Sequence, residues 1–188
     1  MISRSTTIAS RFIYWLTKKE FTHSSLSILD DLDEMYSFCR IYPRLALPAG
    51  LAKESLYRGF YKIHPSIPCR LYKIEVSEKE YEMVKVVLER LLEKRSHFRY
   101  DLTGTFDYLL KRERRVYNQR YCSWFIAEIL GTFEILSFDK PYSLIEPIDF
   151  ANHEKTELLF EGNVESLRNY LKECYNDNGK EGEYEENR

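Results

Sequence analysis

Apolar residues along the 188-residue chain recur at helical spacing in some segments and at strand spacing in others. The clearest helix follows Ser77, where a Ser-x-x-Glu capping box precedes apolar residues spaced by three and four from Val84 to Leu92. The same periodicity predicts further helices at 7–17, 106–111, 122–130 and 164–174. Gly131 directly follows the helix over 122–130, in the position that favours a left-handed C-terminal cap.

Strand-like alternation marks a second set of segments. Residues 21–28 and 35–39 predict a β-hairpin around an Asp-rich turn, and the segments 69–76 and 158–160 predict two further strands. Four prolines make the segment 40–68 a mostly irregular connection, with one helical turn near 52–57. This mixture of helices and hairpin strands predicts an α+β fold with an antiparallel sheet.

Chain length and composition predict one domain over residues 1–174. The remaining residues, 175–188, are rich in Asn, Gly and Glu, and we expect them to form an acidic flexible tail. The longest apolar run near the N-terminus, 12–16, is too short for a signal peptide or a membrane span. We therefore expect a cytoplasmic protein without stable membrane insertion.

Charge and motifs exclude several function classes. The 28 basic and 30 acidic side chains give a net charge of −2, which provides no field to attract nucleic acid. The sequence contains no Walker loop, no G-x-G-x-x-G and no H-E-x-x-H motif. Its four cysteines lie far apart without a C-x-x-C pair, which is typical of free thiols. We therefore expect no nucleic-acid partner, no cofactor and no metal.

Cys122 is the first candidate for chemistry. It lies in the first turn of a predicted helix, where unpaired N–H groups and the helix dipole stabilise a thiolate. The same N–H groups are suited to bind an oxyanion. The alternative is that Cys122 is a small buried hydrophobic residue, as most lone intracellular cysteines are.

His23 is the second candidate, at the start of a predicted strand. An imidazole held there against the helix would take the thiol proton and later return a proton to the leaving group. The alternative is a half-buried histidine that is satisfied by a backbone carbonyl. His64, His97 and His153 lie in loops or at helix ends and lack this setting.

The order of these segments resembles a known superfamily. Thr22-His23-Ser24-Ser25-Leu26-Ser27-Ile28, then Tyr36-Ser37-Phe38-Cys39-Arg40, then Tyr121-Cys122-Ser123-Trp124-Phe125-Ile126 is similar to the circularly permuted papain-like hydrolases. These are relatives of the NlpC-type peptidases and of lecithin retinol acyltransferase, with YiiX-like proteins nearest. The segments Ala49–Glu54, Pro147–Asp149 and Glu161–Gly162 extend the likeness, which spans about residues 8–165.

The resemblance implies a permuted papain-like (NlpC-type) fold, whose antiparallel sheet packs against the cysteine-bearing helix. It further implies Cys122 as nucleophile, His23 as base, and a polar residue on the next strand that orients the imidazole. Ser37, fourteen positions after His23, is our candidate for that third role, and Tyr36 is a weaker one. For the substrate cleft we place the following residues: Trp15, Tyr36, Gly50, Glu54 and Tyr121.

The expected function is that of a thiol hydrolase, an amidase, peptidase or esterase that acts through an acyl-enzyme. Its substrate would be a small molecule, lipid or peptide with an amide or ester bond. Two alternatives stay open. One is a catalytically idle lipid- or peptide-binding module of the same fold, and the other is an acyltransferase.

Overall fold

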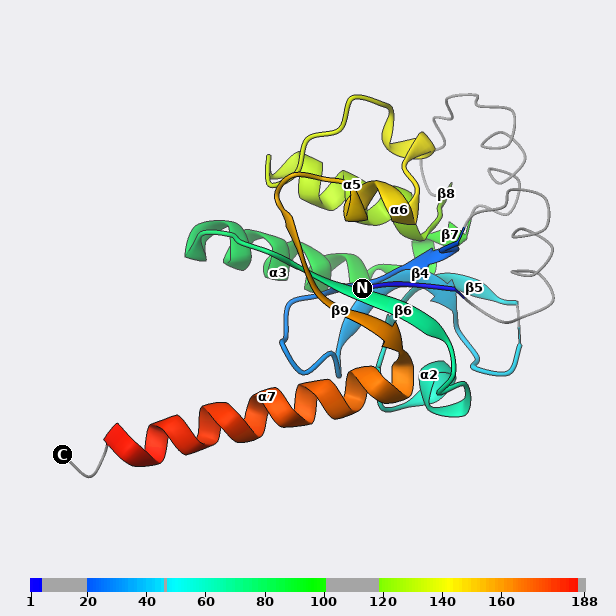
Figure 1. Cartoon of the computed structure of the whole chain (residues 1–188). Helices are drawn as coiled ribbons and strands as arrows, with labels where there is room; N and C mark the ends of the chain where they lie inside the picture. Colours follow the sequence, from blue (N-terminus) through cyan, green and yellow to red (C-terminus); the bar gives the residue numbers. More distant parts are fainter. Residues whose placement is uncertain (5–19, 46, 101–118, 186–188) are drawn as a thin grey trace.

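The structure combines helices with antiparallel sheets, which confirms the predicted α+β class (Figure 1). It is a computed structural model that describes residues 1–4, 20–45, 47–100 and 119–185. Two predicted helices, 7–17 and 106–111, therefore lie outside the described residues. None of the helices in the described ranges has both the length and the apolar character to cross a membrane.

The described strands are β1 (Ile2–Ser3), β2 (His23–Ser24), β3 (Leu26–Ser27), β4 (Met35–Arg40), β5 (Ala49–Glu54), β6 (Pro68–Ile74), β7 (Arg99–Tyr100), β8 (Gln119–Arg120) and β9 (Thr156–Asn163). The described α-helices are α2 (Gly59–Ile63), α3 (Glu78–Glu93), α5 (Cys122–Thr132), α6 (Pro147–Ala151) and α7 (Val164–Glu185). Two 3₁₀ turns accompany them, η1 (Arg95–His97) and η2 (Tyr142–Leu144).

Three sheets organise these strands. The first has the order β2-β1-β6-β9 and the second the order β3-β4-β5, and all pairs in both are antiparallel. A short parallel pair, β7 with β8, forms the third. The predicted hairpin is present as β3 and β4, with Leu26 opposite Tyr36. Strand β2 precedes β3 by one residue but belongs to the other sheet, so the chain changes sheets at Ser25.

The segment after β4 differs from the sequence-based expectation. Residues 49–54, expected to be loop with a helical turn following from 52, form strand β5, which pairs with β4 at six successive positions. The prolines of this region lie outside the strand, since Pro43 and Pro48 precede it and Pro65 and Pro68 follow it. The segment 49–54 itself contains no proline, so the prolines on either side of it do not prevent a regular strand.

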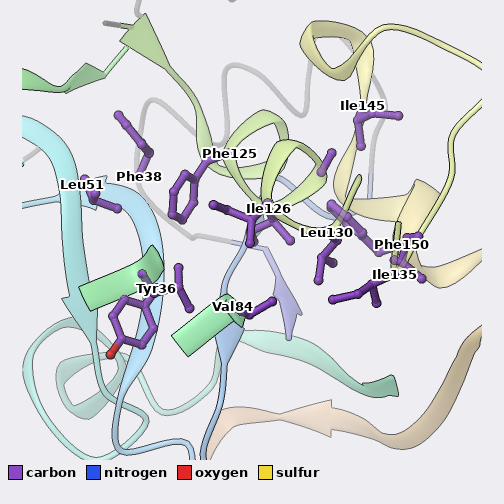
Figure 2. Close-up of a cluster of buried hydrophobic side chains, with 14 residues drawn as sticks. Tyr36, Phe38, Leu51, Val84, Phe125, Ile126, Leu130, Ile135, Ile145 and Phe150 are labelled. Carbon is purple, nitrogen blue, oxygen red and sulfur yellow. The ribbon is translucent and has the colours of Figure 1, made fainter. Parts of the chain in front are cut away.

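Helix α5 is central to the larger hydrophobic core and packs against strands β2 and β4. Eight of its eleven residues are buried, which is typical of a helix enclosed on nearly all sides. The rings of Phe125 on α5 and Phe38 on β4 lie 5.3 Å apart between centroids and are tilted by 58° (Figure 2). This contact fixes the cysteine-bearing helix on the three-stranded sheet.

Two predicted helices have different ends in the structure. Helix α5 continues through Gly131 to Thr132, so Gly131 does not end it; the missing side chain of Gly131 instead leaves room for the ring of Tyr142, which a Cβ at this position would meet. The helix predicted over 164–174 continues to Glu185 as α7, so residues 175–185 of the expected tail are helical. Figure 1 shows α7 extending away from the sheets toward the C-terminus.

The capping box and the remaining strands are confirmed. Ser77 accepts a hydrogen bond from the Glu80 N–H, and the Glu80 carboxylate accepts one from the Ser77 N–H, at the start of α3. The strands predicted over 69–76 and 158–160 are present as β6 and β9.

Candidate functional site

The thiol of Cys122 lies at the first residue of α5, buried beneath strand β2. Tyr121 is the N-cap and provides no side-chain cap, so the first N–H groups of the helix are left for other acceptors. Main-chain groups of Ser24, on β2, and Ser123, within the helix, favour the charged form of the sulfur and so lower the pKa of Cys122. Both predicted elements, the helix start and the strand, therefore converge on this thiol.

The structure brings His23 and Cys122 together, close enough for the imidazole and the thiol to shift each other's pKa. Pairing of β2 with β1 places His23 opposite Ser3 and fixes its strand at the edge of the four-stranded sheet. The imidazole Nε2 lies 2.7 Å from Oε2 of Glu54. That contact leaves Nδ1 as the ring nitrogen available to the thiol.

The electrostatics of the pair favour a thiolate and an imidazolium. Burial by itself disfavours the charged imidazole, but the charges of Glu54 and Cys122 and their hydrogen bonds outweigh it and raise the pKa of His23 to about 10. Burial likewise raises the pKa of the Cys122 thiol. His23 and the two main-chain donors outweigh that effect, so the net pKa of Cys122 is lowered.

Glu54 is the residue that holds the imidazole. Its side chain is only 9% exposed, and it comes from the last position of β5. Burial alone would raise the pKa of its carboxyl, but the charge and hydrogen bond of His23, the hydroxyl of Ser25 and the charge of Arg40 lower it. Ser25 donates to Oε2 of Glu54 over 2.6 Å. The carboxylate is therefore kept ionised inside the protein.

A further shell of hydroxyls supports Ser25. The buried Tyr61 hydroxyl interacts with Ser25 and lies 3.1 Å from the Ser3 hydroxyl. Burial, followed by the charge of Glu54, raises the pKa of Tyr61 well above its usual value, so its proton stays on the oxygen. These neutral groups position Glu54 without competing for its charge.

Two other buried thiols lie in the opposite electrostatic setting. Burial and the neighbouring Glu54 carboxylate raise the pKa of Cys39 well above its ordinary value. Burial raises the pKa of Cys69 to about 12. Among these three cysteines, Cys122 alone has a histidine partner and a lowered pKa. All four cysteines are free thiols, as expected from their spacing.

The predicted third residue, Ser37, does not hold the imidazole. Its buried hydroxyl donates to the carbonyl oxygen of Ser24 over 2.7 Å and so fixes the main chain beside His23. Glu54, which we had placed in the cleft, occupies the orienting position instead. The reason is the sheet change at Ser25, which takes His23 out of the hairpin that contains Ser37.

The other residues predicted for the substrate cleft do not share one surface in the structure. Tyr36 is only 1% exposed and belongs to the hydrophobic core, so it does not line an open cleft (Figure 2). Gly50 is buried where a Cβ would lie 3.2 Å from the Phe98 carbonyl oxygen. Tyr121 donates from its hydroxyl to the carbonyl of Ser143. Trp15 lies outside the described residues.

Sequence reasoning missed the role of Ser25 and gave Glu54 only a general place in the cleft. Glu54 ends a six-residue strand, and recognising that strand would have indicated a fixed position for its carboxylate. The prolines on either side predicted a loop there instead. For Ser25 the sequence carries no signal beyond its position two residues after His23. Its role depends on the sheet change, which only the fold reveals.

The described part of the chain contains no group of three or more His, Cys, Asp or Glu side chains arranged to hold a metal ion. Searches of protein-family models, curated proteins and solved structures found no match to the chain. The arrangement at Cys122 is therefore interpreted from its own chemistry: a polarised thiol, an imidazole that can carry a proton, and a carboxylate that orients it.

Replacing Glu54 with Gln should lower the pKa of His23 below its value of about 10, because the carboxylate is one of the charges that raises it. The measurement is an NMR titration of the His23 ring. Glu34→Gln is the matched control, because Glu34 pairs with Lys53 at the surface and should leave the His23 titration unchanged. Equal titration curves for the wild type and Glu54→Gln would contradict the assignment.

Replacing Ser25 with Ala should raise the pKa of the Glu54 carboxyl, because the Ser25 hydrogen bond favours the charged form. Carboxyl-carbon NMR would follow the titration, and Ser25→Thr, which keeps the hydroxyl, should restore the wild-type curve. Ser27→Ala is the control, since that hydroxyl donates to the carbonyls of Leu29 and Glu34. A curve unmoved by Ser25→Ala would leave Ser25 with a packing role alone.

Proposed function

We propose that this chain is a thiol hydrolase that cleaves an amide or ester bond through an acyl-enzyme on Cys122. The observation that carries the proposal is the continuous contact from the Cys122 thiol through His23 to the Glu54 carboxylate. A buried histidine that served only for packing would not need a buried carboxylate on one side and a thiol on the other. Opposite pKa shifts in the thiol and the imidazole are typical of a prepared nucleophile.

In the acylation step, the Cys122 thiolate attacks the carbonyl carbon and forms a C–S bond. The imidazolium of His23 then gives its proton to the departing amine or alkoxide as the bond to the carbonyl carbon breaks. Neutral His23 next removes a proton from water, whose oxygen attacks the thioester. The acid product leaves, and the thiolate and imidazolium are restored. Glu54 keeps the ring oriented through both steps.

The start of α5 is suited to stabilise the oxyanion. The helix has eleven residues and no side-chain cap, so the N–H of Cys122 and the positive end of the dipole are directed at the reacting carbonyl. Removal of one such donor in hydrolases typically costs about 10²–10³ in kcat.

We further propose a permuted papain-like fold for the domain. Two observations support it: the histidine strand precedes the cysteine helix in the chain, and α5 packs on antiparallel strands. The carboxylate at Glu54 also comes before the cysteine, so all three proposed catalytic groups follow the permuted order.

Replacing Cys122 with Ala should abolish labelling of the protein by an electrophilic acyl probe, because the other buried thiols have raised pKa values and no histidine partner. Intact-protein mass spectrometry would detect the adduct, and peptide mapping would locate it. Cys174→Ala is the control and should label as the wild type does. Labelling that persists in Cys122→Ala would remove the nucleophile assignment.

The pH dependence of alkylation distinguishes a hydrolase from an idle binding module. In the wild type, iodoacetamide should react with Cys122 well below the ordinary thiol pKa of about 8.5, because the thiolate forms alongside the charged imidazole. In His23→Gln, only burial and the main-chain donors remain, so the reaction should require higher pH. If both proteins gave the same ordinary thiol profile, the idle module would be the better interpretation.

A further inference from the structure

The loop that joins β4 to β5 holds several large apolar side chains in solvent. The Ile41 N–H donates to the Pro48 carbonyl and closes the base of the loop. The Leu45 N–H donates to the Tyr42 carbonyl and closes a β-turn with Pro43 at its second position, where proline is favoured. Four large apolar side chains of this loop are each between 51% and 55% exposed: Ile41, Tyr42, Leu45 and Leu47.

Helix α2 lies beside this loop, as Figure 1 shows. A Cβ on Gly59, the first residue of α2, would lie 3.5 Å from the Cγ of Pro43. Lys62 and Ile63 follow Gly59 by three and four positions, so they lie on the same side of the helix, and both are exposed. The loop and α2 therefore form one surface, which we call the β4–β5 patch: the four apolar loop residues together with Arg44, Lys62 and Ile63.

The charge of this region is opposite in sign to that of the whole chain. Residues 35–74 include seven Lys and Arg but a single acidic residue, Glu54, which is buried in the candidate site, whereas the whole chain has a net charge of −2. Some of these basic groups are neutralised by acidic residues from elsewhere, as Arg58 is by Asp33. Arg44 and Lys62 form no ion pair with any residue in the described ranges. The β4–β5 patch therefore combines exposed apolar side chains with unneutralised positive charge.

We propose that the β4–β5 patch docks the protein reversibly on the surface of an anionic phospholipid bilayer. Its apolar side chains enter the region between the lipid headgroups, and Arg44 and Lys62 face the lipid phosphates. Contiguous exposed apolar surface marks an interaction site, and the strength of interfacial binding grows with the apolar area that is buried and with attraction to anionic lipids. Tyr42 suits the same depth, because tyrosine is enriched at the membrane–water interface.

The shape of the patch favours a bilayer over a protein partner. The apolar side chains project from a turn, and a protein would have to offer a matching pocket to each of them. The acyl region of a bilayer accepts such side chains without a matched shape. Anionic headgroups also supply the negative charge that Arg44 and Lys62 lack within the described part of the chain.

Co-sedimentation of the full chain with vesicles tests the docking. The protein should bind phosphatidylcholine vesicles that are enriched in phosphatidylserine, bind pure phosphatidylcholine only weakly, and lose affinity as salt screens the charges. Leu45→Ser combined with Leu47→Ser should weaken binding at least tenfold, because two apolar side chains no longer leave water. The matched control is Leu158→Ser with Leu159→Ser, a pair of exposed leucines on β9, which should bind as the wild type does.

The basic groups are tested by a second pair of variants. Arg44→Gln combined with Lys62→Gln should weaken binding to the anionic vesicles about thirtyfold, because each basic side chain near such a surface contributes about 1 kcal/mol. Lys79→Gln combined with Lys172→Gln removes the same charge from exposed positions on α3 and α7 and should bind almost as tightly as the wild type. This comparison separates the location of the charge from the net charge.

Entry of the loop into the bilayer is measured by fluorescence quenching. A tryptophan introduced by Tyr42→Trp should be quenched by bromine-labelled acyl chains, and one introduced by Leu158→Trp should not. Absence of binding to anionic vesicles, or equal losses in the patch variants and their controls, would overturn the proposal. Binding of poly-glutamate without binding of vesicles would overturn it in favour of an acidic protein partner. None of these measurements depends on reaction at Cys122, so the docking surface and the hydrolase are tested separately.

Discussion

The buried contact between Glu54 and His23 is the constraint on which the candidate site depends. A carboxylate that is 9% exposed is costly unless a charge and several donors surround it, and here the imidazole, Ser25 and the charge of Arg40 provide them. Removal of one partner from such a pair commonly destabilises a protein by about 3–5 kcal/mol. The charged imidazole that results is the one that lowers the pKa of Cys122. Stability of the interior and acidity of the thiol therefore depend on the same ion pair.

Electrostatics also explains why the buried thiols of this chain differ in pKa. Cys39 and Cys122 both interact with the ion pair, but with different members of it. Cys39 faces the carboxylate, which disfavours a second negative charge, whereas Cys122 faces the imidazole and two main-chain donors. Because both thiols are buried, the difference between their pKa values follows from which member of the ion pair each one meets.

The sequence was most informative where local signals and tertiary structure agree. The capping box at Ser77 and the amphipathic spacing after it predicted α3, and the helix start at Cys122 was correct because apolar periodicity marked α5. The pairing of His23 with Cys122 was predicted from the resemblance in residue order. The proline content of the whole connection predicted a loop where strand β5 lies. Because this strand positions Glu54, the contact between Glu54 and the imidazole was not predicted either. Ser37 was chosen on the assumption that one hairpin holds both residues, but long-range pairing with β1 separates them.

The change of sheets at Ser25 has a mechanical consequence. His23 is carried by β2 in one sheet, whereas Glu54, whose carboxylate contacts its ring, comes from β5 in the other. Any sliding of one sheet past the other would therefore alter the distance between His23 and Glu54. The single serine at the crossover joins both layers and bonds to the carboxylate. The position of Glu54 relative to His23 therefore depends on how the two sheets are held together at Ser25.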